Sequence, residues 1–402
     1  MKPLIDSLTK PNDSKMLLVI LDGLGGLPSK KHDNKTELEY ADTPNMDEMA
    51  RQYETGLHIP VETGITPGSG PGHLSVFGYD PKTHIIGRGI LEALGIDVEV
   101  DSGSVTARCN FSTIDNEGRI TDRRAGRIST PKNKELCDKL SRKIDKIDGY
   151  PVEFHSGKEH RFVFVIRSIE CSGDVSDTDP QATGVKPLDA EPSGDNARNT
   201  AVIINKASNM IGEVLKDEEK ANYALFRGVS TYPDIETMEE RFKIKPACIA
   251  TYPMYRGLAK LVGMDILSSG STLSDELNAL SENYERYDYF FLHVKKSDSY
   301  GEDGEFDLKV KVIEEFDSHL PSLMKHDFDV IAITGDHSTP ALMKSHSSHN
   351  VPLLLIHQHA RHNNVKGFSE LECINGAIGT IYGKHIINLM LDSAGRLKKF
   401  GA

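Results

Sequence analysis

The chain has few cysteines, and no two of them are close together. Its 402 residues include only Cys109, Cys137, Cys171, Cys248 and Cys373. Small secreted domains are cross-linked by disulfides between closely spaced cysteines, and structural zinc sites use CxxC pairs. The spacing therefore predicts reduced thiols in a cytoplasmic protein and excludes a disulfide framework or a cysteine zinc site.

An excess of basic residues is also missing. The sequence has 47 Lys and Arg against 60 Asp and Glu, which gives a formal net charge of −13. Proteins that bind nucleic acids usually carry a basic surface, so we expect no nucleic-acid partner. A local cluster of arginines can still attract a small anion to an acidic protein.

Long apolar runs are absent as well. No stretch reaches the roughly 18 consecutive apolar residues of a membrane helix. The opening segment MKPLIDSLTKPNDSK lacks the apolar centre of a signal peptide. We therefore expect a cytoplasmic protein without a membrane partner. The length suffices for two or three domains with cores of their own.

Four short apolar runs are present, each near glycine, proline or charged residues. They are MLLVIL (16–21), DYFFLHV (288–294), DVIAITGD (329–336) and VPLLLIHQ (351–358). Runs of this length are typical of strands that are buried on both faces of a sheet.

A helix is predicted between the second and third of these runs. In FDLKVKVIEEFDSHLPSLM, the apolar residues Leu308, Val312, Phe316 and Leu320 are four apart and are expected to share one face. Strand, helix and strand in this order predict parallel strands joined by a right-handed crossover. The fold class is therefore α/β, with a central, mostly parallel sheet flanked by helices.

The middle of the chain has a different pattern. Residues 108–126 contain two short segments around an Asn-Glu-Gly turn, and residues 160–168 alternate between apolar and polar. A polar segment, 172–200, predicts a long functional loop before an amphipathic helix. We predict an inserted α+β domain at 80–244, within a discontinuous domain formed by 1–79 and 245–402.

Acidic and imidazole side chains follow or precede the predicted strands. They are Asp22, Asp298, Glu302, Asp336, His337 and His346. Functional groups of open α/β sheets collect at the carboxyl ends of strands, and crowded carboxylates repel one another unless a cation is bound. Mixed sets of this kind suit Mn²⁺ or Zn²⁺, and Mg²⁺ where oxygen ligands dominate.

Each of these residues also has an ordinary explanation. Asp22 alone would more often be a helix N-cap, and the spacing of Asp298 and Glu302 is common among solvated helix acids. The coincidence of three strand ends favours two divalent metals.

The segment TPGSGPGHLSVFGYDP (66–81) places one serine, Ser69, among glycines and prolines. Such residues mark turns, so a surface loop is the simplest interpretation. Two neighbouring metals could activate Ser69 as a nucleophile and hold phosphoryl oxygens. We therefore predict phosphoryl transfer through Ser69, with His73 as a substrate contact.

Arginines supply a complementary charge. The segment DRRAGR places Arg123, Arg124 and Arg127 beside Asp122. A solvated basic turn is the simpler explanation for so short a segment, but arginine binds phosphate and carboxylate through two parallel hydrogen bonds. A trap for a small dianion is the alternative that we favour. His160, Arg161 and Arg227 are added to it on weaker grounds.

Taken together, these motifs resemble the 2,3-bisphosphoglycerate-independent phosphoglycerate mutases, most closely their archaeal-type branch, in the alkaline phosphatase superfamily. The resemblance runs from about residue 16 to about residue 356. The stretches that carry it are LDGLGGLP, ADTPNMD, TPGSGPGHLSVFGYDP, ARCNF, DRRAGR, HRFVFVIR, SDTDP, YPMYRGLAKLVGM, HVKKSDSYGEDGEFDLKVKVIEEFD and GDHSTP.

The resemblance implies an alkaline-phosphatase-like core with an inserted domain that binds phosphoglycerate. It implies interconversion of 3-phosphoglycerate and 2-phosphoglycerate, in glycolysis and gluconeogenesis, through a phosphoserine. Two Mn²⁺ or Mg²⁺ ions are implied, with Zn²⁺ as another option, and no 2,3-bisphosphoglycerate. Asp22, Ser69, Asp336 and His337 resemble one metal site, and Asp298, Glu302 and His346 resemble the other.

Two positions depart from the family pattern. Glu302 stands where the family usually has histidine, which favours Mg²⁺ or Mn²⁺ over zinc. Gly70 stands where an acid often follows the nucleophile. Two alternatives therefore stay open: a phosphatase or phosphotransferase that acts on another small phosphorylated metabolite, and a relative that has lost its activity. The sequence leaves both a monomer and a homo-oligomer open.

Overall fold

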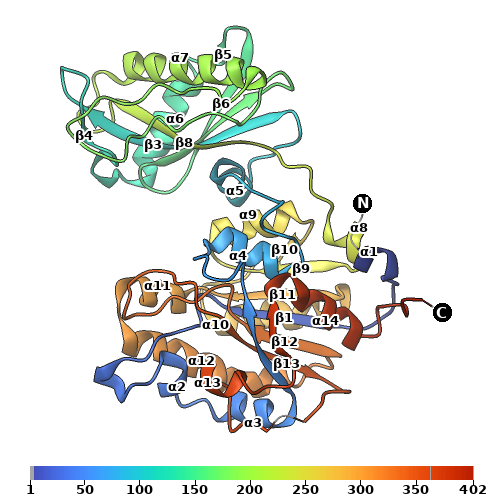
Figure 1. Ribbon diagram of the computed structural model, residues 1–402. Helices are drawn as coiled ribbons and strands as arrows, with labels where there is room; N and C mark the ends of the chain where they lie inside the picture. The colour runs from blue at the N-terminus through green and yellow to red at the C-terminus, as the bar shows by residue number, and fades with distance from the viewer. Residues whose placement is uncertain (1–3, 363, 402) are drawn as a thin grey trace. The chain divides into compact units, whose positions relative to one another are not determined.

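The structure is a computed structural model that describes residues 4–362 and 364–401. The chain forms two compact units (Figure 1). The first unit consists of Met1–Ile85 and Ile235–Ala402, and the second of Ile86–Asp234. No helix among the described residues is both long and apolar enough to cross a membrane. All five cysteines are buried and unpaired.

The first unit is built on an eight-stranded sheet with the order β10-β9-β11-β1-β12-β13-β2-β14. All neighbouring strands are parallel except at β13, which runs antiparallel to β12 and to β2. The predicted α/β class with a mostly parallel sheet is confirmed. The strand bounds are β1 Met16–Leu21, β2 Glu54–Ile59, β9 Pro246–Ile249, β10 Asp265–Ile266, β11 Tyr289–Val294, β12 Val330–Thr334, β13 Val351–His357 and β14 Gly379–Tyr382.

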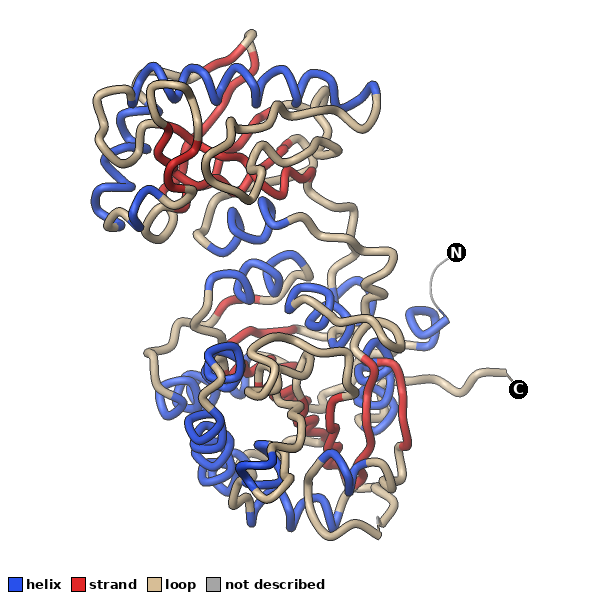
Figure 2. Tube along the Cα trace, turned by 60° about the vertical axis from the view of Figure 1, so that its left-hand side comes forward, coloured by secondary structure: helices blue, strands red, loops and turns tan. Residues whose placement is uncertain are grey.

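Helices cover this sheet on both sides, as the blue segments around the red strands show (Figure 2). The α3, α10 and α12 helices share one core with Leu17, Val19 and Leu21 of β1, while α14 packs against β12. The helix bounds are α1 Leu4–Leu8, α2 Glu37–Tyr40, α3 Pro44–Gln52, α4 Ser69–Val76, α8 Met238–Phe242, α9 Pro253–Leu261, α10 Leu273–Asn283, α11 Lys296–Asp303, α12 Phe306–Leu323, α13 Glu370–Cys373 and α14 Ile386–Ser393.

The helix predicted after residue 305 is present as α12, but the predicted buried face is partly wrong. Leu308 is 36% exposed, whereas Val312, Phe316 and Leu320 are buried. A spacing of four residues gains about 40° per step on a helix of 3.6 residues per turn. Leu308 has therefore rotated out of the core, and Lys309 takes its place on the buried face.

The second unit is an antiparallel sheet with the order β4-β3-β7-β6-β5, in which β8 also pairs with β3. Long helices α6 and α7 and the shorter α5 pack against it. The predicted α+β class of the insertion is confirmed. The bounds are α5 Arg88–Gly95, β3 Ser104–Ile114, β4 Ile120–Asp122, α6 Thr130–Ser141, β5 Lys146–Ile147, β6 Tyr150–Ser156, β7 Arg161–Arg167, α7 Arg198–Leu215 and β8 Tyr223–Thr231.

Alternate residues of β7 face two different layers. Phe162 and Phe164 join the core beneath α6 and α7, while Val163 and Val165 join Ala93 of α5 on the other face. Successive side chains of a strand point to opposite faces, so Arg161 belongs to the α5 face. This assignment locates the arginines described below.

Candidate active site

The sheet register brings three chain segments together at one edge of the first unit. Leu21 pairs with Val294, and Ile20 pairs with Thr334, so the residues that follow β1, β11 and β12 emerge side by side. These strands are parallel, and ligands of open α/β sheets bind at this carboxyl edge. His346 precedes β13, and it reaches the same edge because β13 is antiparallel.

Asp22, Asp336 and His337 form the first group of candidate metal ligands. All three are fully buried, and one donor atom from each lies within 4.8 Å of the others. Burial opposes ionisation of Asp22, yet His293 and Lys295 hold its pKa well below the usual range. Burial and the neighbouring Asp22 raise the pKa of Asp336.

Asp298, His337 and His346 form the second group, within the same 4.8 Å limit. His337 therefore belongs to both groups, and its ring stacks on that of His346 at 3.7 Å. Glu302 Oε1 lies 3.6 Å from His346 Nε2, so it borders this group. Burial, followed by the charge of Asp298, raises the pKa of Glu302.

A threonine hydroxyl connects the two groups. Thr339 Oγ1 donates to Asp298 Oδ1 at 2.7 Å and lies 3.0 Å from His337 Nδ1. Since the single hydroxyl proton goes to Asp298, His337 must carry its own proton on Nδ1 and keep a lone pair on Nε2. Burial lowers the pKa of His337 well below its usual value, which keeps the imidazole neutral. An acceptor on the far nitrogen commonly fixes the tautomer of a metal-binding histidine.

Ser69 opens helix α4 beside these groups. Its Oγ lies 3.3 Å from His337 Nε2. The helix approaches the sheet edge closely because Gly72 has no side chain: a Cβ there would lie 2.5 Å from the carbonyl oxygen of Asp336. The glycines of the 66–81 segment thus bring Ser69 to the ligand groups.

The predicted substrate contact His73 lies beneath Ser69 and is fully buried. Its Nδ1 bonds to the carbonyl oxygen of Ser69 at 2.8 Å and lies 3.0 Å from Asp336 Oδ2. Burial alone would lower the pKa of His73, but Asp336 and Asp22 together with the bond to Ser69 raise it. These contacts describe a residue that holds Ser69 against Asp336.

Sequence reasoning missed three residues of this site: Lys295, His293 and Tyr255. Lys295 Nζ lies 3.0 Å from Asp22 Oδ2 and also pairs with Asp298. Tyr255 donates to Asp22 Oδ2 at 2.5 Å. Lys295 could have been found, because it directly follows the predicted strand 288–294. Tyr255 comes from α9, and no local pattern indicated it.

The residues of both groups fit divalent metal ions. Asp22 Oδ1 is buried without a hydrogen-bond partner, and Asp336 Oδ2 lies 3.0 Å from His73 Nδ1 and 3.1 Å from His337 Nε2. Buried carboxylate oxygens without partners are costly. Carboxylate and neutral imidazole donors around them are the set that Mn²⁺ and Zn²⁺ prefer.

A second constellation lies in the inserted unit, on the α5 face of its sheet. Arg108 pairs across the strands with Arg227 of β8, and Asn110 pairs with Arg161 of β7. Like charges directly opposite in a sheet are destabilising. Arg161 Nε and His160 Nδ1 are buried without a hydrogen-bond partner. Such an arrangement suits a bound anion.

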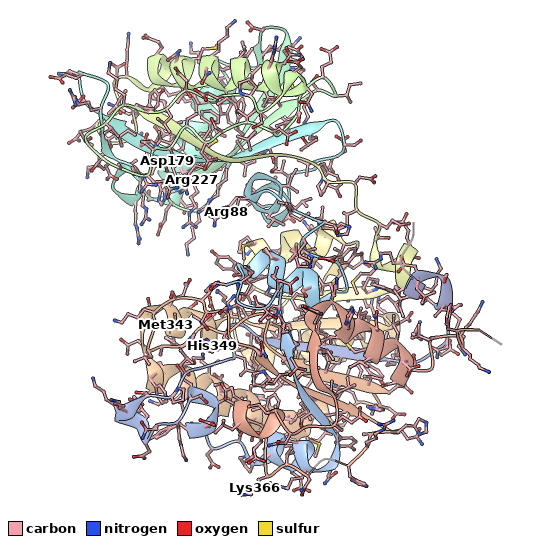
Figure 3. All side chains as sticks on the ribbon, viewed as in Figure 1. Arg88, Asp179, Arg227, Met343, His349 and Lys366 are labelled. Atoms are coloured by element: carbon pink, nitrogen blue, oxygen red, sulfur yellow. The ribbon has the colours of Figure 1, made fainter. Side chains whose placement is uncertain are left out.

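Sequence reasoning missed Arg108 and Arg88 of this constellation. Burial, followed by the charges of Arg161, Arg88 and Arg227, lowers the pKa of Arg108. Figure 3 labels Arg88 and Arg227 together with Asp179 on this unit. Arg108 lies within ARCNF, but its facing partners depend on strand register, which a single sequence does not reveal.

The DRRAGR segment folds as a turn that Asp122 organises. Asp122 accepts hydrogen bonds from the backbone N–H groups of Arg124 and Gly126 at 2.8 and 2.6 Å. Arg123 is held by Asp179 through two bonds of 2.8 Å. Arg124 and Arg127 are exposed. The structure therefore places Asp122 and Arg123 in scaffold contacts, and their predicted role at the substrate stays a prediction.

Comparison with known proteins identifies the family. Residues 50–221 match the family model described as 2,3-bisphosphoglycerate-independent phosphoglycerate mutase. A protein of Aquifex aeolicus described as a probable member is 51% identical over 406 residues, which cover 99% of each chain. A probable member from Thermus thermophilus is 47% identical over 403 residues, 100% of this chain and 99% of that one.

Two solved structures are also similar to this chain over nearly its full length. The PH0037 protein of Pyrococcus horikoshii aligns with a TM-score of 0.84 at 30% identity, over 98% of this chain and 100% of that one. A cofactor-independent phosphoglycerate mutase of Thermoplasma acidophilum gives 0.75 at 28% identity, over 95% and 100%. The α/β fold and the serine beside two candidate metal groups thus occur in a chain that is similar to members of this family over its full length. The chain belongs to the 2,3-bisphosphoglycerate-independent phosphoglycerate mutase family.

Proposed function

We propose that this protein interconverts 3-phosphoglycerate and 2-phosphoglycerate without 2,3-bisphosphoglycerate, through a phosphoserine at Ser69. The observation that carries the proposal is the position of the Ser69 hydroxyl at 3.3 Å from His337 Nε2, where both candidate metal groups meet. Metal coordination is one of the ways in which a serine hydroxyl is activated for covalent catalysis.

The first step forms a bond between Ser69 Oγ and phosphorus while the bond from phosphorus to the substrate C3 oxygen breaks. The serine proton is transferred to the C3 oxygen that leaves phosphorus, which becomes a hydroxyl group of glycerate. In the return step the C2 oxygen attacks phosphorus, the bond to Ser69 Oγ breaks, and the serine regains a proton. No water is consumed and no inorganic phosphate is released.

The chain's own residues assist both steps. The lone pair on His337 Nε2 is available to a metal ion beside the serine hydroxyl, because the Nδ1 proton is directed to Thr339. Lys295 places a positive charge beside the carboxylates, since Asp22 and Asp298 outweigh burial and raise its pKa. Ser69 begins a helix, where backbone N–H groups and the helix dipole favour a phosphate.

Asp22, Ser69, Asp336 and His337 would hold one divalent ion, and Asp298, His346 and Glu302 the other. Bound there, such ions neutralise phosphoryl oxygens and lower the pKa of the serine hydroxyl. Mn²⁺ and Mg²⁺ are the ions that we propose, because Glu302 adds a hard oxygen donor to the second group.

The arginine constellation of the inserted unit is proposed to bind the phosphate or carboxylate of phosphoglycerate. Arg108, Arg161 and Arg227 share one face of the sheet. Arginine forks recognise both groups through paired hydrogen bonds. Exposed Arg124 and Arg127 would contribute from the turn.

A ³¹P NMR time course with the protein, Mn²⁺ and 3-phosphoglycerate tests the proposal. We expect a 2-phosphoglycerate resonance without added 2,3-bisphosphoglycerate and with little inorganic phosphate. Inorganic phosphate as the main product would instead indicate a phosphatase on the same scaffold.

The Ser69→Ala variant tests the nucleophile. We expect no detectable 2-phosphoglycerate while circular dichroism stays that of the wild type. Ser75→Ala is a matched control in the same helix. Near-normal turnover by Ser69→Ala would exclude the phosphoserine.

A further inference from the structure

A lysine occupies a core position of helix α12. Lys309 is fully buried, and it shares the inner face of the helix with Val312, Ile313 and Phe316. Lysine is almost never fully buried unless it is paired. A leucine would fill this position at lower cost, so the contacts of the ammonium group explain its presence.

The Lys309 ammonium joins two loops. It donates to the carbonyl oxygen of Gly25 at 3.1 Å and to that of Thr339 at 2.9 Å. The first loop follows β1 and begins with Asp22, and the second follows β12 and contains His337. Thr339 adds a direct connection, because its N–H donates to the Gly25 carbonyl at 3.0 Å.

Glu37 is the buried partner of Lys309, and it touches the same two loops. Its Oε2 lies 4.0 Å from Lys309 Nζ, and both side chains are fully buried. Its Oε1 accepts from the N–H of Ala341 at 2.7 Å. The backbone of Gly26 packs against the carboxylate, since a Cβ there would lie 1.9 Å from Glu37 Oε2.

We propose that the Lys309–Glu37 pair is a positioning device for the metal centre, which sets the Asp22 loop and the His337 loop in register so that their ligands converge. This inference rests on the proposed function. Lys309 is a positioning residue, because it acts through Gly25 and Thr339. A role in stability alone is a poor explanation, because replacing a buried ion pair with apolar residues is often neutral or stabilising.

The test compares Mn²⁺ binding by wild type and by the double variant K309M/E37Q, which removes both charges of the pair. Each protein is first treated with a chelator to remove bound metal and is then titrated with Mn²⁺. Electron paramagnetic resonance measures the Mn²⁺ that stays free. We expect binding to weaken by about 10–100-fold, the usual effect of losing an outer support of a metal ligand. Excess Mn²⁺ should restore mutase turnover, which a general loss of folding would not allow.

A matched control is the buried pair Arg241–Asp6, whose atoms lie 3.3 Å apart in the same unit. R241M/D6N removes a comparable pair that makes no contact with either loop, and its Mn²⁺ affinity should stay within about twofold of wild type, since distant sites behave independently. Unchanged Mn²⁺ affinity in K309M/E37Q would overturn the inference.

Two further outcomes are informative. If K309M/E37Q does not fold, K309Q replaces it, because the glutamine amide can still donate to a carbonyl. K309Q should then lose less affinity than K309M, and equal affinities in K309Q and K309M would overturn the inference. If wild type and D22N bind Mn²⁺ equally, the metal site of the proposed function fails, and this inference fails with it.

Discussion

At the scale of single residues, the position of one proton decides how the site works. Thr339 Oγ1 donates to Asp298 and accepts from His337 Nδ1. The direction of these bonds frees Nε2 of His337, the atom that faces Ser69. A hydroxyl that touches neither substrate nor nucleophile thus fixes the tautomer on which the proposed chemistry depends.

Thr339→Val should therefore weaken Mn²⁺ binding and lower kcat by about 10–100-fold, because the shape is retained but the hydroxyl is lost. Thr339→Ser keeps the hydroxyl and should retain most of both. Mn²⁺ titration and steady-state kinetics of the two variants give the comparison. Equal losses in both variants would show that the methyl group, and not the hydroxyl, matters.

His160 provides a second prediction for a single residue. It is 3% exposed, and burial, followed by the charge of Arg161, lowers its pKa to about 4. The unfolded chain has a histidine pKa of about 6.5. The contribution of neutral His160 to the free energy of unfolding is therefore complete above about pH 6.5. It is lost as the pH falls towards 4, because the unfolded chain takes up the proton more readily. The free energy of unfolding should fall by about 2 kcal/mol between pH 8 and pH 5.

NMR titration of labelled histidines measures this directly. The imidazole signal that disappears in His160→Gln should not titrate between pH 8 and pH 5. A midpoint near the ordinary value would mean that His160 is not buried beside Arg161 in solution.

At the scale of elements, the contact between α4 and the Asp336 loop depends on Gly72. A Cβ there would meet the Asp336 carbonyl oxygen at 2.5 Å and its carbon at 3.1 Å. Backbone atoms cannot move aside cheaply, so Gly72→Ala should displace Ser69 from the ligand groups. Misplacement by about 1 Å can reduce turnover about 10²-fold.

The same substitution elsewhere is the control. Gly212 lies within α7, where a Cβ would make an ordinary contact with Tyr223 at 3.4 Å. Gly212→Ala should leave kcat unchanged and raise the melting temperature slightly, because alanine favours helices by up to about 1 kcal/mol. Wild-type kcat in Gly72→Ala would show that α4 does not position Ser69.

The elements also show what a single sequence can predict. The strands around Asp22, Lys295 and Asp336 were predictable, because apolar runs bounded by polar residues have one common explanation. The direction of β13 was not, since a strand buried on both faces has no pattern that encodes direction. Lys309 was missed for a similar reason: a charged residue on a predicted helix is normally assigned to the solvent face.

The candidate site followed the same rule. Residues at strand ends, such as Asp22 and His346, were predictable because the strands fix where they emerge. Tyr255 and Arg108 were not, because their positions depend on packing and register between segments far apart in the sequence. Local patterns thus indicated the candidate metal ligands better than the residues that surround them.

At the scale of the whole molecule, the two kinds of candidate site belong to different compact units. The candidate metal ligands lie in the unit formed by 1–85 and 235–402, and the arginine constellation lies in 86–234. A ligand stabilises the folded unit that binds it, by about 2.7 kcal/mol at a hundred times its dissociation constant. The two classes of ligand should therefore protect different parts of the chain.

Hydrogen exchange monitored by mass spectrometry can separate these effects. Mn²⁺ alone should slow exchange in 1–85 and 235–402 and leave 86–234 unchanged, whereas 3-phosphoglycerate without metal should slow exchange in 86–234. Asp22→Asn should abolish the first effect and keep the second, because the carboxylate is a proposed metal ligand and the arginines are untouched. Protection of 86–234 by Mn²⁺ alone would place a metal in the inserted unit and contradict this division of roles.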